Sequence, residues 1–225
     1  ISGSEIKLTL SDGCQISTSL LIGADGRKSP SAGRAGIKSI GWEYGQTALV
    51  CAIQHEIPHE GVACQYFLPA GPLAILPLTE NRASIVWSET AQNAKQIMAL
   101  SEADYLSILR QRIGDYVGKI SMAGKRYSYP LDLTLAQSFI APRLALIGDA
   151  AHGLHPIAGQ GLNSGLRDIA ALVQVLKEAK LRGEDIGAST TLMRYQEWRR
   201  FDATSLALAT DTFNRLFSND NSLLR

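Results

Sequence analysis

A short apolar run between Pro142 and Gly148 constrains the fold of this chain more than any other feature. Residues 144–147 are all apolar, and Asp149 follows directly after the glycine. A run of this length between a proline and a glycine is typical of a strand that is buried on both faces, as in a parallel sheet. The sequence therefore predicts a buried strand with an acid at its carboxyl end.

A glycine-rich turn and a helix are predicted to follow this strand. Gly159, Gln160 and Gly161 form the turn. Apolar residues at helical spacing come next: Leu162, Leu166, Ile169, Val173 and Leu176. Ligands of open parallel sheets bind beyond the carboxyl ends of the strands, and a helix N-terminus there offers free N–H donors. We therefore expect a site in which Asp149 accepts hydrogen bonds from sugar-like hydroxyls and the glycine backbone approaches an electron-rich group.

A second acid follows an apolar run near the N-terminus. Residues 20–22 are apolar and lead into Gly23-Ala24-Asp25-Gly26. A single acid in this place often caps a loop or helix after a strand, and capping is the simpler interpretation. Two strand-end acids in one chain, one of them before a Gly-x-Gly helix start, favour a cofactor site.

A hairpin opens the chain and two helices close it. Asp12-Gly13 is a strong hairpin signal between predicted strands at residues 5–10 and 14–22. The helix after the glycine-rich turn is expected to end near Leu181, and a second helix to span residues 189–217.

The middle of the chain has the pattern of an antiparallel sheet. Its short β-branched and aromatic runs are separated by Gly, Pro and Asn, which predicts a second layer. The expected strands are residues 47–53, 62–68, 73–78, 82–87 and 118–128. Residues 90–100 and 102–113 are predicted helices, the second with Ser101 as its N-cap.

Composition excludes several classes of function. The net charge is +1 and no block of basic residues occurs, so nothing indicates nucleic-acid binding. The three cysteines have no C-x-x-C spacing and suit core thiols in a reducing compartment. The uncharged run 61–79 contains three prolines, which favours two strands over a membrane span. With no signal-peptide pattern, we expect a cytoplasmic protein, at most peripheral to the inner membrane.

The side chains of this sequence predict neither a metal site nor a catalytic dyad. His152 and His155 lie three residues apart in a loop rich in Gly and Pro, so packing roles are expected, and a ligand contact of His155 stays open. Neither a G-x-S-x-G nor a P-loop pattern occurs. Arg194, Arg199 and Arg200 are predicted to form a solvated helix face. A bound cofactor would then carry the difficult chemistry.

The stretch after the buried strand resembles a known motif. Residues 148–152, Gly-Asp-Ala-Ala-His, together with Pro156 and residues 159–163, resemble the second FAD-binding motif of flavin-dependent aromatic-ring hydroxylases. Within that superfamily the chain is most similar to the hydroxylases of ubiquinone biosynthesis. Further similar stretches are residues 71–78, 84–87, 123–126 and 182–187.

The N-terminal acid lies in a second similar motif. Asp25-Gly26 with Ser29 resembles the other internal motif of this family, which is associated with FAD and with NAD(P)H access. That motif usually carries an arginine three residues after the serine. This chain has Ala32 in that place, and Arg34 lies out of register.

The resemblance implies an FAD site. It implies that Asp149 binds the ribityl hydroxyls and that the backbone of residues 156–163 lies beside the isoalloxazine ring. The implied cofactor-binding residues are Asp25, Gly26, Gly148, Asp149, Pro156, Gly159, Gln160, Gly161, Leu162 and Asn163. We predict that the carboxylates of Asp25 and Asp149 lie close together at the edge of a single sheet and face one flavin-shaped hollow.

The implied fold is α/β, a partial doubly wound FAD-binding domain with an inserted antiparallel β-sheet substrate domain. The FAD-binding parts are residues 1–42 and 131–225, and the substrate domain is residues 43–130. Family members open with a strand, a G-x-G-x-x-G turn and a helix, which bind the ADP half of FAD. Residues 159–164 match that turn only in part, because Ser164 replaces the third glycine. We therefore expect a fragment with an incomplete FAD site and no activity.

The resemblance also implies a reaction. NAD(P)H reduces FAD, O2 adds to form a hydroperoxyflavin, and this species hydroxylates a polyprenylated phenol of the ubiquinone pathway, in an enzyme that can join a biosynthetic complex. Three alternatives stay open. They are hydroxylation of a small soluble aromatic acid, reduction of prenyl chains by a related flavin enzyme, and a non-catalytic binding module of such a complex.

Overall fold

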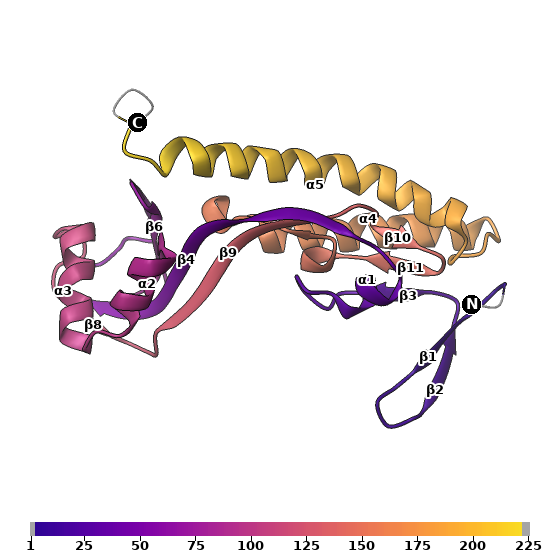
Figure 1. The fold of residues 1–225 in the computed structure, drawn as a ribbon, viewed down its shortest axis with the longest axis horizontal. Coiled ribbons are helices and arrows are strands. Elements are labelled where there is room, and N and C mark those ends of the chain that lie inside the picture. The colour runs from indigo at the N-terminus through magenta and orange to yellow at the C-terminus, as the bar shows by residue number, and fades with distance from the viewer. Residues whose placement is uncertain (1–2, 222–225) are drawn as a thin grey trace. The chain divides into compact units, whose positions relative to one another are not determined.

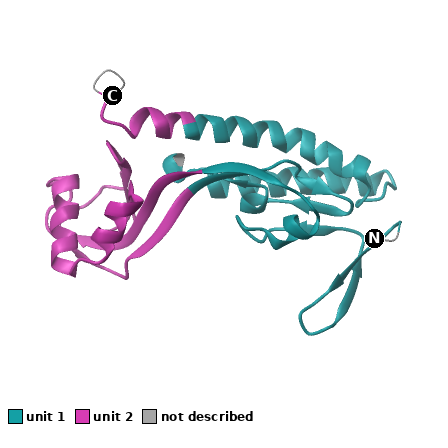
Figure 2. Ribbon diagram, in the orientation of Figure 1, with its two compact units in different colours: residues 1–42, 132–211 teal, residues 43–131, 212–225 magenta. Residues whose placement is uncertain are grey.

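The computed structural model describes residues 3–221, and the chain divides into two compact units. Unit 1 comprises Ile1–Trp42 and Asp132–Asp211, and unit 2 comprises Glu43–Leu131 and Thr212–Arg225 (Figure 2). Each unit is therefore built from two separate stretches of sequence. Figure 1 labels the helices and most of the strands along the chain.

Unit 1 contains a three-stranded mixed sheet. Its strands are β10 (Ile140–Ala141), β11 (Leu144–Leu146) and β3 (Leu21–Gly23), in that order. β11 runs parallel to β3, with Leu146 opposite Gly23, and all three residues of β11 are buried. A Cβ at position 23 would lie 2.8 Å from the Leu146 side chain, so glycine permits this close pairing. The prediction of a buried strand in a parallel pair is confirmed.

The N-terminal hairpin is present, but its second strand is shorter than predicted. β1 (Ile6–Thr9) and β2 (Gln15–Thr18) are antiparallel. The prediction of one strand over residues 14–22 is wrong, because the chain leaves the hairpin after β2 and forms β3 separately. The amide of Leu21 donates to the carbonyl of Arg143 at 2.9 Å, so pairing with the β11 segment replaces pairing within the hairpin.

Three helices complete unit 1: α1 (Pro30–Arg34), α4 (Gly161–Leu181) and α5 (Ser189–Phe217), whose last residues belong to unit 2. Both long helices end where the sequence predicts. The hydroxyl of Tyr195 donates to the carbonyl of Leu146 at 2.7 Å and ties α5 to β11. The core around this contact includes Leu144, Ala171, Leu172, Val175 and Leu192.

The apolar residues that predict α4 lie mostly on its exposed side. Leu162, Leu166, Ile169 and Val173 are exposed by 76, 53, 45 and 58%. The helix instead buries small, polar and a few aliphatic side chains: Ser164, Asp168, Ala171, Leu172, Val175 and Ala179. In unit 1, β3 is also left uncovered on one side, because it is the edge strand of its sheet among the described residues. The helical spacing of apolar residues thus predicts the helix correctly but not the face that packs.

Unit 2 is built on an antiparallel sheet. In this sheet β5, β6, β7 and β4 are neighbours in that order, and β8 pairs with the end of β4. The bounds are β4 Ser39–His55, β5 Cys64–Leu68, β6 Gly71–Pro77, β7 Arg82–Thr90 and β8 Ile120–Met122. The predicted antiparallel layer is confirmed, although the strand expected at 118–128 is limited to β8 and the start of β9 (Tyr127–Ala136).

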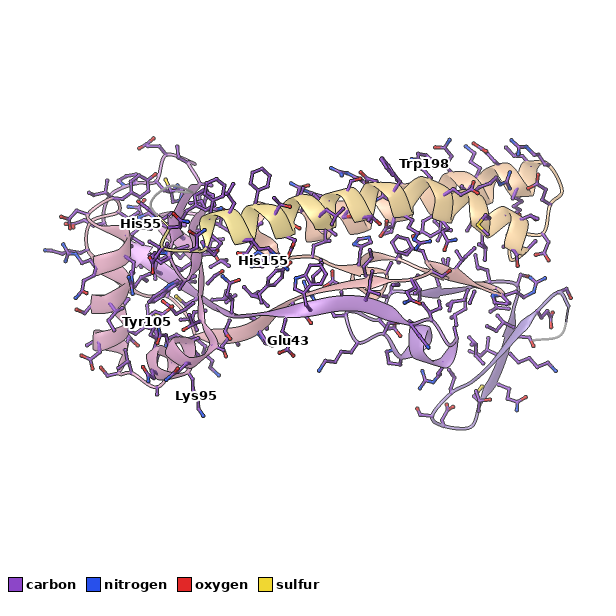
Figure 3. All side chains as sticks on the ribbon, turned by 45° about the horizontal axis from the view of Figure 1, so that its top comes forward. Glu43, His55, Lys95, Tyr105, His155 and Trp198 are labelled. Carbon is purple, nitrogen blue, oxygen red and sulfur yellow. The ribbon has the colours of Figure 1, made fainter. Side chains whose placement is uncertain are left out.

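The core of unit 2 combines this sheet with α2 (Ala91–Met98) and α3 (Glu102–Ile113). Trp87 and Tyr105, the latter labelled in Figure 3, are fully buried with ring centroids 6.2 Å apart. Ser101 is the N-cap of α3, as predicted, because its Oγ accepts a hydrogen bond from the amide of Asp104 at 3.2 Å.

The uncharged run at residues 61–79 contributes the two strands β5 and β6, as its prolines predict. In the part of the chain that the structure describes, no helix combines the length and the apolar character that crossing a membrane requires.

Candidate functional site

The structure brings the two predicted acids to one edge of one sheet. Asp25 follows β3 and Asp149 follows β11, and these two strands are parallel neighbours. The amide of Ile147 donates to the carbonyl of Gly23 at 3.0 Å, so the two chain segments are still paired where they leave the sheet. This edge is the carboxyl end of the parallel pair, where ligands of such sheets bind. That both carboxylates face one hollow stays a prediction.

The carboxylate of Asp25 caps its own loop. It accepts hydrogen bonds from the hydroxyl of Ser29 at 2.5 Å and from the amide of Ser31 at 2.8 Å. Partial burial opposes the charge, but these bonds outweigh it and hold the pKa of Asp25 below its usual range. Ala32, in the place of the family arginine, is a buried core residue of α1. A role of Asp25 towards a cofactor therefore stays a prediction beside its observed capping role.

Asp149 is paired with Arg27, which belongs to none of the site residues predicted from the sequence. The Nε of Arg27 donates to Asp149 Oδ2 at 3.2 Å, and its Nη2 donates to the carbonyl of Leu154 at 2.6 Å. Nη1 donates to the carbonyl of Asp132 at 2.9 Å and also to its carboxylate. The only signal in the sequence is that Arg27 directly follows Asp25-Gly26.

A buried carboxylate holds the turn that carries Asp149. Asp168, in α4, is not exposed, and its Oδ2 accepts hydrogen bonds from the amide of Gly148 at 2.8 Å and from His152 Nε2 at 2.6 Å. Its Oδ1 accepts from Arg199 Nε at 2.7 Å. Burial opposes the charge, but the hydrogen bonds from His152, Arg199 and Gly148 keep the pKa of Asp168 below its usual range.

This network corrects one prediction. Arg199 is only 3% exposed, so the prediction that it belongs to a solvated face is wrong for this residue. The reason is Asp168, which lies 31 residues earlier and supplies the charge that makes burial of a guanidinium tolerable. Arg199 also pairs with Asp202 at 2.5 Å on the more exposed side of α5.

The two histidines of the loop serve the structure around the turn. His152 is fully buried and its Nε2 donates to Asp168, whereas its Nδ1 has no hydrogen-bond partner in the described chain. His155, labelled in Figure 3, accepts a hydrogen bond at Nδ1 from the amide of Ile157 at 3.1 Å. Burial, together with the charge of Arg27, lowers the pKa of His155 to about 4, so it is neutral at pH 7.

The glycine-rich turn leaves the start of α4 open. Pro156 begins a short 3-10 turn, η2 (Pro156–Ala158), and Gly159 follows with a φ of +60°, in the left-handed region that glycine tolerates. Gln160 is the N-cap of α4 and makes no side-chain capping bond to it. The first N–H groups of the helix, at Gly161, Leu162 and Asn163, are therefore available to an electron-rich acceptor.

These features together suit a polyhydroxylated, electron-rich cofactor. The side chain of Asp149 is 43% exposed, and its Oδ1 accepts no hydrogen bond from the described residues. A carboxylate of this kind binds hydroxyl groups, whereas the helix N-terminus favours negative charge. At position 165 a Cβ would lie 3.4 Å from the Cα of Gly148, so glycine lets α4 approach the turn closely. The residues present thus fit the ribityl and ring portions of a flavin.

Known proteins are similar to this chain in sequence and in fold. Residues 5–209 match the FAD binding domain family. The chain is 46% identical over 218 residues to the ubiquinone hydroxylase UbiL of Rhodospirillum rubrum, covering 96% of this chain and 50% of that protein. It is 34% identical over 253 residues to the ubiquinone biosynthesis monooxygenase COQ6 of Homo sapiens, covering 97% and 54%. The chain spans about half the length of these relatives.

Two solved structures are similar in fold. PqsL of Pseudomonas aeruginosa in complex with 2-aminobenzoylacetate aligns with a TM-score of 0.81 at 23% identity, covering 95% of this chain and 59% of that one. HpxO of Klebsiella pneumoniae, complexed with FAD and uric acid, aligns with a TM-score of 0.79 at 17% identity, covering 100% and 58%. At these identities the likeness concerns the fold alone.

Proposed function

Because the chain belongs to the FAD binding domain family, we propose that unit 1 supplies the ribityl and ring side of an FAD site. The observation that carries this proposal is the pairing of β3 with β11, which puts the loops of Asp25-Gly26 and Gly148-Asp149 at one sheet edge. Asp149 would bind the ribityl hydroxyls through its free oxygen. The backbone from Pro156 to Asn163 would lie beside the ring, with the first N–H groups of α4 as donors.

The parent reaction that we propose is hydroxylation of a polyprenylated phenol in ubiquinone biosynthesis. Curated relatives at 46% and 34% identity carry names of that pathway, which supports this substrate class. FAD, reduced by NAD(P)H, would supply the oxygen-activating chemistry, and no protein acid or base is assigned to it. The protein would bind the ring beside the flavin and exclude water. We assign the substrate to the antiparallel sheet within residues 43–130, and the flavin to residues 1–42 and 131–225.

We further propose that this chain alone holds FAD weakly and does not turn over substrate. The support is its length, about half that of the relatives, and the lack of a full G-x-G-x-x-G match. We also propose that the protein joins a ubiquinone-biosynthesis complex and contacts the inner membrane peripherally.

The test is a titration of the chain with FAD, in which binding is measured by the quenching of flavin fluorescence. We expect weak binding that Asp149→Asn reduces by about tenfold, which corresponds to the loss of one hydrogen bond to a charged group. Asp12→Asn removes an exposed acid of the hairpin turn and should leave the titration unchanged. Absence of any flavin response, or equal responses of Asp149→Asn and wild type, would refute the proposed site. Stoichiometric tight binding would refute the incomplete site.

A further inference from the structure

Arg27 contacts three separate segments of unit 1. Each nitrogen of its guanidinium meets a different acceptor: Nε the carboxylate of Asp149, Nη2 the carbonyl of Leu154, and Nη1 the carbonyl and carboxylate of Asp132. These acceptors lie after β11, after β12 (His152–Gly153) and in β9. We propose that Arg27 is a positioning residue that fixes the carboxylate of Asp149 for a cofactor hydroxyl. The proposal rests on the flavin site proposed above.

The shape of the arginine head group explains why this residue suits the task. A guanidinium is planar, stays charged and presents its donors in a rigid fork, so several acceptors are held at fixed angles to one another. A lysine at position 27 has one ammonium group and no fork. With Asp149 Oδ2 held by Arg27, Oδ1 is the oxygen left to accept from a ligand.

A glycine lies next to the guanidinium of Arg27 and leaves room for it. A Cβ at position 153 would lie 3.1 Å from Cγ of Arg27 and 3.2 Å from its Nε and Cζ. The flat side chain of Arg27 therefore lies directly against Gly153, which is itself buried in β12. A Cβ at position 153 would therefore require the side chain of Arg27 to shift by a few tenths of an ångström relative to its acceptors. This close fit is an observation independent of the hydrogen bonds.

The negative charges of two neighbouring carboxylates also depend on Arg27. Two carboxylates, Asp132 and Asp149, share this one cation, and without it they would repel each other. His155 lies close enough to be influenced by Arg27, and it is neutral at pH 7, so it does not compete for the carboxylates. Removal of Arg27 should therefore let the Asp149 carboxylate turn towards solvent.

The first experiment needs no flavin. Hydrogen exchange of the peptides covering residues 148–155 is compared between wild type, Arg27→Met, Gly153→Ala and the control Arg34→Met, which removes an exposed arginine of α1. We expect about tenfold faster exchange for Arg27→Met and Gly153→Ala, and exchange within about twofold of wild type for Arg34→Met. Wild-type exchange in Arg27→Met would overturn the proposal.

The second experiment asks whether Arg27 acts through Asp149. FAD dissociation constants are measured for Arg27→Met, Asp149→Asn and the double variant. We expect Arg27→Met to weaken binding about tenfold, Arg27→Lys to recover part of that loss, and the double variant to match Asp149→Asn within about threefold. Multiplicative losses in the double variant would mean a merely structural role and overturn the proposal. If wild type binds no flavin, the proposed function fails, and hydrogen exchange still decides the role of Arg27.

Discussion

The carboxylate of Asp168 accepts the Nε2–H of His152 at 2.6 Å, and neither side chain is exposed to solvent. The same carboxylate binds Arg199 and the amide of Gly148, so one buried charge joins α4, α5 and the turn before Asp149. Removal of one partner from such a buried group leaves the other charge uncompensated.

Asp168→Asn should therefore destabilise the protein by about 3–5 kcal/mol, measured by urea unfolding. The matched control is Asp202→Asn, because Asp202 also pairs with Arg199 but is 41% exposed. An exposed pair contributes less than about 1 kcal/mol. Equal losses for the two variants would contradict the assignment of the network to the buried Asp168.

Acid should destabilise the protein through His155. Its pKa is lowered to about 4 in the folded protein and is about 6.5 when unfolded, so between these values the unfolded state binds the additional proton. The contribution of His155 to the free energy of unfolding has its full value above pH 6.5. It falls by about 1.4 kcal/mol per pH unit as the pH decreases towards 4. We expect His155→Gln to lose this part of the acid dependence in unfolding curves at pH 7 and pH 5.

The reference for that experiment is the wild-type protein, measured at the same two pH values. An unchanged pH dependence in His155→Gln would show that this histidine is not held neutral by burial.

Gly41 tests how closely β4 and β9 approach each other in unit 1. A Cβ at this position would lie 1.9 Å from the carbonyl oxygen of Leu133, which is backbone and cannot turn away. Gly41→Ala should cost about 1–3 kcal/mol of unfolding free energy, as overpacking does. Gly33→Ala, in α1 with open space around it, should be neutral or stabilise by up to about 1 kcal/mol. A lower melting temperature of Gly33→Ala than of Gly41→Ala would contradict this close approach of Gly41 to the backbone of β9.

The exposed apolar face of α4, formed by Leu162, Leu166, Ile169 and Val173, leads to a further prediction. Leu166 is 53% exposed and Leu172 is 3% exposed, although both are leucines of the same helix. Leu166→Gln should change the free energy of unfolding by less than about 0.5 kcal/mol, whereas Leu172→Ala should cost about 2–5 kcal/mol. The measurement is urea unfolding of the two variants. A large loss of unfolding free energy in Leu166→Gln would mean that this face of α4 is buried in solution.

Much of the fold follows from local patterns in the sequence. The run at residues 144–147 predicts β11, because four apolar residues between Pro142 and Gly148 suit burial on both faces. Ser101 predicts the start of α3, since its hydroxyl can satisfy a helical amide within the same turn. These features depend on residues that are neighbours in the chain.

The candidate site was predictable only in part. The sequence places an acid after each of two apolar strands, and general rules for parallel sheets then bring Asp25 and Asp149 to one edge. It does not reveal that Asp25 caps its own loop or that Arg27 binds Asp149, 122 residues away. Nor does it reveal which face of α4 is buried, because periodicity defines a face without saying what covers it.

By itself, the amino-acid sequence determined the kinds of elements, the buried strand and the strand-end acids, since these depend on propensities and spacing within a few residues. Only the tertiary structure decided which charges are buried and paired. Asp168 and Arg199 lie 31 residues apart and are both buried, and a buried ion is tolerated only when folding brings its partner within hydrogen-bond distance.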